Sequence, residues 1–205
     1  MNAMKKAAAV LQELMDGNAR FLDERSIQSP SSSLKKLKDF ANAGQLPKAI
    51  VLCCSDSRAP VEMIFDQDIG DLFVIRVAGN IVAPSLVGSV EFAASTFGTE
   101  LVVVMGHTGC GAVKATVDYI SDPSSIKSEN IHDIVGRIKP HVFSIAQHTS
   151  MSYEEKLHHA VVANVGASVD QLSHSSRLIE ELVVSGKIQI VGALLDLHSG
   201  AVSFL

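Results

Sequence analysis

A chain of 205 residues, 47% hydrophobic and 19% charged, is long enough to bury one substantial core and too short to need two. The net charge of -5 and the scattered Lys and Arg residues provide no basic surface for a nucleic-acid backbone, so nucleic-acid binding is not expected. Two lysines precede a short apolar run near the start, but Gln12 and Glu13 end that run too early for a signal peptide or a membrane span. We therefore expect one cytoplasmic domain, 1–205, with no membrane segment.

The first 44 residues are expected to form a helical arm. Apolar residues recur at helical spacing from Met4 to Phe21, and a charged helical stretch, LKKLKDFANAG, follows the Ser- and Pro-rich segment 26–33. The apolar stripe of the first helix must cover another surface. We therefore divide the domain into an N-terminal helical arm, 1–44, and an α/β core, 45–205.

Beyond the arm, short apolar runs alternate with helical patterns. The apolar runs span 49–54, 72–77, 101–106 and 188–197. Helices are expected at 85–98, at 111–120 and over a long stretch from about 153 to 184. This alternation favours a mainly parallel sheet with crossover helices on its faces. The segment HSGAV then turns the chain into a final antiparallel edge strand that ends at Leu205.

Two segments at the carboxyl ends of predicted strands carry candidate metal ligands. Cys54 ends the first run and opens CSDSR, and His107 and Cys110 follow the third run within GHTGCG. Open parallel sheets bind ligands at this edge, because their loops converge there. Thiolate and imidazole are the usual ligands of zinc, and three protein ligands leave a fourth position for water, as in catalytic sites. The sequence therefore predicts a catalytic zinc site.

Asp56 leaves two arrangements of that site open. It lies two residues after Cys54 and two before Arg58, so its carboxylate can pair with the guanidinium or bind the metal. Pairing keeps the fourth metal position open, whereas binding closes it. Cys53, as the neighbour of Cys54 on a strand, should point to the opposite face and belong to the core.

The segment CSDSR followed by GHTGCGAV resembles the paired signature of beta-class carbonic anhydrases, and GNARF, DLFVIRVAGNIV, VGSVEFAA and NVGASVDQL agree with it. The resemblance implies a four-stranded parallel core with a C-terminal edge strand, and an arm that wraps a partner subunit. It implies a homodimer that can pair into a homotetramer, with active sites at the dimer interface. It also implies one Zn²⁺ per subunit, held by Cys54, His107 and Cys110. The implied activity is that of a carbonate dehydratase: reversible hydration of carbon dioxide to bicarbonate and a proton by zinc-bound hydroxide.

The same resemblance assigns further residues. Asp56 and Arg58 match the family's catalytic Asp/Arg pair. Gln45, contributed across the interface, and Phe73 and Phe92 match the residues that line the carbon dioxide pocket. Many members have a tyrosine where this chain has Phe92, so one hydroxyl is missing from the expected pocket.

One subgroup of the family is inhibited by bicarbonate and has a tryptophan where this chain has Val51. Arg76 does match the arginine of that subgroup. We predict the open arrangement, in which Asp56 pairs with Arg58 near neutral pH and becomes a fourth ligand only in a closed state.

Three other functions stay open at this point. A binding protein with a structural or regulatory zinc would keep Asp56 on the metal, and an enzyme with the same fold could hydrolyse another small linear molecule such as carbon disulfide. A thiol oxidoreductase using Cys53 and Cys54 is disfavoured by the lack of a CxxC motif. The sequence does not rank the candidate proton shuttles, which are His132, His141, His148, His158, His159, His174 and His198.

Overall fold

The computed structural model describes residues 3–27 and 30–205. Within them, a five-stranded sheet has the order β2-β1-β3-β4-β5, in which β1 to β4 are parallel and β5 is antiparallel to β4. The strands are β1 (Ala49–Cys53), β2 (Leu72–Arg76), β3 (Leu101–His107), β4 (Gln189–Leu195) and β5 (Val202–Phe204). The predicted α/β fold, with a parallel core and an antiparallel edge strand, is confirmed.

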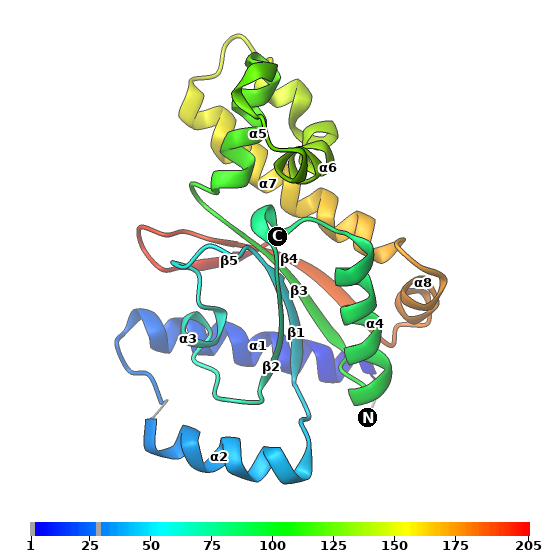
Figure 1. Cartoon of the computed structure of the whole chain (residues 1–205). Coiled ribbons are helices and arrows are strands. Elements are labelled where there is room, and N and C mark those ends of the chain that lie inside the picture. The colour runs from blue at the N-terminus through cyan, green and yellow to red at the C-terminus, as the bar shows by residue number, and fades with distance from the viewer. Residues whose placement is uncertain (1–2, 28–29) are drawn as a thin grey trace.

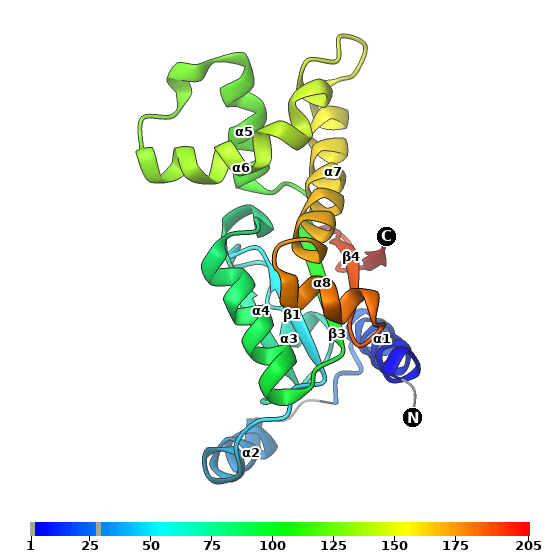
Figure 2. The same cartoon turned by 90° about the vertical axis from the view of Figure 1, so that its right-hand side faces the viewer.

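Alternate residues of the central strands pack into two apolar layers, one on each face of the sheet. On one face, Val51 and Cys53 pack with residues of α1 (Ala3–Leu22) and α3 (Val61–Ile64). On the other face, Ile50 and Leu52 pack with residues of α4 (Pro84–Phe97) and α8 (Arg177–Val184). The two views in Figures 1 and 2 show α1 on one side of the strands and α4 on the other. Because β1 and β3 are covered on both faces, their residues are apolar without alternation.

The carboxyl ends of the strands lie beneath a third group of helices. These are α5 (Gly111–Ser121), α6 (Glu129–Ala146) and α7 (Tyr153–Ser173), with two short 3-10 turns, η1 (Ala78–Asn80) and η2 (Pro123–Ser125). They stand at the top of Figure 1 and share an apolar cluster with Cys54 and Cys110. The helix expected over 153–184 is in fact two, α7 and α8. They are separated because the Ser176 hydroxyl caps a new helix by accepting from the Ile179 N–H.

The N-terminal helices also contact the loops that connect the strands. Arg20 of α1 pairs with the buried Asp66 at 2.6 Å. The helix α2 (Pro30–Ala43) pairs Lys36 with Asp68 at 2.9 Å. Phe40 of the same helix packs against Gly70, where an added Cβ would lie 2.5 Å from the ring. The linker was predicted over 26–33, but α2 already begins at Pro30. Residues 28 and 29 lie outside the described part of the chain.

The division into an arm, 1–44, and a core, 45–205, stays a prediction. In the described residues, no helix combines the length and the apolar character that a bilayer crossing requires.

Candidate functional site

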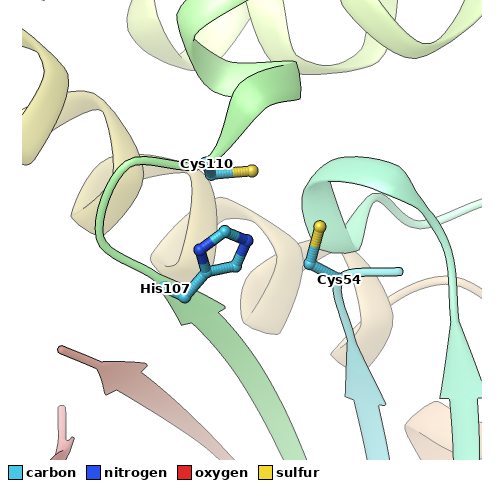
Figure 3. Close-up of side chains that lie close together, drawn as sticks. All are labelled: Cys54, His107 and Cys110. Atoms are coloured by element: carbon cyan, nitrogen blue, oxygen red, sulfur yellow. The ribbon is translucent and has the colours of Figure 1, made fainter. Parts of the chain in front are cut away.

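Three candidate ligands meet at the carboxyl edge of the sheet. Cys54 follows the last residue of β1, His107 ends the adjacent strand β3, and Cys110 is the residue before α5. The ligand atoms of all three lie within 4.8 Å of one another, and Figure 3 shows the side chains converging. The parallel pairing of β1 with β3, which sets Cys53 beside Met105, brings the two strand ends to the same level.

A tight turn between His107 and Cys110 lets both side chains face one point. Gly109 adopts a φ of 67°, a left-handed conformation that glycine accepts without a steric penalty. The Thr108 N–H donates to the Leu195 carbonyl of β4 at 2.9 Å, which ties the turn to the sheet. The conformation of Gly109 and this hydrogen bond together fix the geometry of the turn.

His107 is oriented as a metal ligand would be. Its Nδ1 lies 3.0 Å from the Thr108 carbonyl, which can only accept, so this nitrogen carries the hydrogen. The lone pair then remains on Nε2, which is buried and has no hydrogen-bond partner among the residues that the structure describes. A buried polar atom without a partner is costly, and a cation at this point would satisfy it. The donor set, two thiols and one imidazole, fits zinc.

The two thiols are buried, and each shifts the pKa of the other. The hydrogen bond with Cys110 holds the pKa of Cys54 well below its usual value despite burial, with help from the Gly79 N–H, which lies 3.4 Å from Sγ. The same contact with the Cys54 thiolate raises the pKa of Cys110. A divalent cation at this point would stabilise both sulfurs as thiolates.

Asp56 is held by Arg58 in a two-pronged ion pair. Nε of Arg58 donates to Oδ1 at 2.9 Å and a terminal nitrogen donates to Oδ2 at 2.8 Å. These bonds hold the pKa of the Asp56 carboxyl well below its usual range. Oδ2 also lies 3.7 Å from His107 Nε2, which is beyond hydrogen-bond length. The carboxylate thus stands beside the candidate metal position while its oxygens are bound to the guanidinium.

Arg76 has a role that the sequence did not reveal. It ends β2 opposite Cys53, and its guanidinium donates to the Cys54 carbonyl at 3.0 Å and to the Asp56 carbonyl at 2.5 Å. Both acceptors are backbone atoms, so no side-chain motif could have indicated the contact. Arg76 therefore fixes the loop that carries one ligand and the Asp56 carboxylate.

The three expected pocket residues do not join this cluster within one chain. Phe73 pairs with Ile50 in the sheet, four residues before the level of Cys54, which corresponds to about 13 Å along the strand. Phe73 and Phe92 contact each other, with ring centroids 6.3 Å apart, and Phe92 is 53% exposed. Gln45 is exposed between α2 and β1, at the amino side of the sheet.

Cys53 behaves as a core residue. It is completely buried with the apolar side chains under α1, and burial raises the pKa of its thiol to about 12. A thiol that stays protonated is a poor nucleophile, and the three cysteines are unpaired. These properties argue against the thiol oxidoreductase.

Comparisons with known proteins agree with one another. The sequence profile described as "Carbonic anhydrase" matches residues 49–202. Carbonic anhydrase 2 of Mycobacterium tuberculosis is 35% identical over 196 residues, which cover 94% of this chain and 89% of that protein.

Two solved structures are similar as well. The beta-carbonic anhydrase CcaA has a TM-score of 0.75 at 25% identity, covering 95% of this chain and 94% of the other. A structure from a study of two tetrameric beta-carbonic anhydrases of Sordaria macrospora has a TM-score of 0.70 at 23% identity, covering 85% and 92%. The chain therefore belongs to the beta-carbonic anhydrase family, whose members are lyases of the carbonate dehydratase class.

Proposed function

We propose that this protein is a zinc-dependent carbonic anhydrase that interconverts carbon dioxide and bicarbonate, with one Zn²⁺ per chain held by Cys54, His107 and Cys110. The observation that carries the proposal is the meeting of two thiols and the unpartnered Nε2 of a buried histidine in a chain of this family. When bound, zinc supplies a Lewis acid that lowers the pKa of water to about 7, so that the nucleophile is available at neutral pH.

The residues of the chain prepare the site for that chemistry. The Thr108 carbonyl fixes the tautomer of His107, and Arg76 fixes the loop of Cys54. Arg58 occupies both oxygens of Asp56, which keeps the carboxylate from becoming a fourth ligand. Asp56 can still accept a hydrogen bond from a water or a protonated substrate oxygen, and so orient it. This open arrangement argues against a purely structural zinc.

The carbon dioxide pocket is proposed to be completed by a second copy of the chain. Gln45, Phe73 and Phe92 lie on the amino side of the sheet in their own subunit, so they can line a site only across an interface. The half-exposed ring of Phe92, close to the edge strand β2, is an apolar surface of the kind that subunits bury. We therefore infer a homodimer with interfacial sites, which can pair into a homotetramer.

Metal analysis combined with stopped-flow hydration assays tests the proposal. We expect about one zinc per chain, hydration of carbon dioxide that is lost on chelation with dipicolinate, and recovery when zinc is restored. Full activity in a zinc-free preparation would contradict the zinc chemistry. A zinc-loaded protein inactive on carbon dioxide across the pH range would favour a structural metal, or, if it hydrolyses carbon disulfide, the related hydrolase.

A further inference from the structure

A pocket of about 360 Å³ opens beside the metal site, on the side of the turn between β4 and β5. It is lined by Arg58, Thr108, Gly109, Leu197 and His198. Arg58 holds the Asp56 carboxylate, and the Thr108–Gly109 segment joins the two ligands His107 and Cys110. The pocket is large and polar enough to hold several waters, since one water occupies about 30 Å³ in the liquid. It therefore connects the surroundings of the site with the exposed imidazole of His198.

The turn that carries His198 is well ordered by hydrogen bonds. Asp196 accepts from the His198 N–H at 2.8 Å and from the Ser199 hydroxyl at 3.1 Å. The Leu197 N–H donates to the Thr108 hydroxyl at 3.0 Å, which joins this turn directly to the turn of the metal ligands. His198 is thus held at the pocket by its backbone, while its side chain is exposed to solvent.

Hydration of carbon dioxide releases one proton per turnover, and this proton must leave the site. We propose that His198 is the group that carries it from the pocket water to solvent. A pocket water that has received this proton from the site passes a proton to an imidazole nitrogen and is left neutral, the ring becomes imidazolium, and a buffer base in solution removes the proton again. Histidine suits this task because it exchanges protons near neutral pH. The charged groups near the ring are the Asp196 carboxylate, which accepts from the His198 N–H, and the Arg58 guanidinium, which lines the same pocket and is paired with Asp56.

The other histidines outside the metal site have contacts elsewhere. His132 stacks edge-on against Tyr119, His141 contacts Gln171, and His148 contacts Ser150. The remaining three are on α7 or at its end: His158 and His159 contact each other, and His174 contacts Asp170. None of these partners belongs to the candidate site.

Substitution of His198 by Ala separates proton transfer from the chemical step. The proposal rests on the proposed hydratase function, so the assay compares the zinc-loaded variant with the zinc-loaded wild-type protein. In weakly buffered solution kcat should fall on the order of tenfold, since a positioned acid–base group contributes at least this much, while kcat/KM stays unchanged. Added imidazole should restore kcat. In ¹⁸O exchange, the interconversion of carbon dioxide and bicarbonate should persist, and the release of labelled water should slow by a similar factor.

His174→Ala is the matched control, because it removes an exposed imidazole on the far end of α7 and should change neither kcat nor the exchange rates. His198→Asn keeps a polar side chain of similar size and should repeat the defect. As a readout apart from activity, diethyl pyrocarbonate should label His198 in the wild-type chain, as detected by mass spectrometry.

Three results would overturn the proposal: an unchanged kcat at low buffer, an equal fall of kcat and kcat/KM, or a His198 that resists labelling. A zinc-loaded wild-type protein without hydratase activity would overturn the proposed function as well. An active wild-type protein whose kcat does not depend on His198 would overturn the shuttle alone.

Discussion

The carboxyl edge of the sheet and the amino side of the same strands differ in how complete they are. At the carboxyl edge, one chain brings together three candidate metal ligands, and its own Arg58 and Arg76 position Asp56 and the loop around it. On the amino side, the aromatic rings of Phe73, Phe92 and Phe97 pack together, with Phe92 half exposed. The candidate metal site is formed within one chain, whereas the aromatic surface is one that a partner subunit would cover. Metal chemistry and subunit assembly should therefore be separable by mutation.

The largest effect is expected at the candidate metal site. His107→Ala removes the nitrogen whose lone pair faces the two thiols, so the variant should lose zinc and should lose hydration to the background rate. Metal analysis and stopped-flow hydration measure both losses. Cys54→Ser should behave alike, because a hydroxyl is a poor zinc ligand.

Cys53→Ala is the matched control for Cys54, since its thiol is buried on the opposite face of the same strand. It should retain zinc and turnover, and lose about 1 kcal/mol of stability from the smaller side chain. Loss of zinc from Cys53→Ala, or retention of zinc by His107→Ala, would contradict this assignment of ligands.

A smaller effect should follow from Asp56→Ala. The variant removes the carboxylate beside the metal position but none of the three ligands, so zinc should remain bound. Residues that orient metal-bound groups typically contribute about 10–100-fold to activity, and a fall in kcat/KM of that size is expected. If Asp56→Ala instead loses zinc while wild type holds it, the carboxylate is a ligand and the open arrangement is wrong.

The unequal completeness of the two regions also explains what could be predicted from the sequence. The meeting of the candidate ligands was predictable because Cys54 follows one apolar strand, His107 and Cys110 lie at the end of the next, and parallel pairing brings such positions to one edge. The contacts of Arg76 were not, because its acceptors are backbone carbonyls, which carry no residue-specific signal. The break between α7 and α8 was missed as well, since helical periodicity continues across Ser176 while its hydroxyl begins a new helix.

Phe92→Ala tests the amino side. If a partner buries this ring, its removal should cost about 1.5–3 kcal/mol of association, a ten- to hundredfold weaker dimer, and should lower kcat/KM with zinc still bound. Sedimentation at decreasing protein concentration and subunit-exchange rates measure the association. Phe143→Ala on α6 is the control, because it removes a ring of comparable exposure, 42%. Equal association of wild type and Phe92→Ala would show that Phe92 is not at the interface.

The smallest effect on activity is expected at the attachment of α1, where a loss of stability should depend on pH. Burial raises the pKa of Asp66, but hydrogen bonds from Ser26, Arg20 and the Ile27 N–H outweigh it, so the pKa is lowered in the folded protein. A carboxyl with a lowered pKa stabilises the fold above its unfolded value, about 3.9, and this contribution is lost as pH falls through the folded value.

Asp66→Asn suits the backbone there, which has a positive φ of 47° that asparagine tolerates. It should be about 2 kcal/mol less stable than wild type near neutral pH, since hydrogen bonds to a charged group contribute roughly that much. The difference should shrink below about pH 4, where the wild-type carboxyl takes up its proton.

Denaturant unfolding at several pH values measures this difference in stability. Asp23→Asn is the control, because Asp23 belongs to an exposed ion pair and its substitution should change stability little. Zinc content and turnover near neutral pH should be the same in all three proteins, because the Asp66 side chain holds α1 and the residues after it to the loop after α3, through Arg20, Ser26 and Ile27. A pH-independent difference would mean that Asp66 acts through its shape rather than its charge.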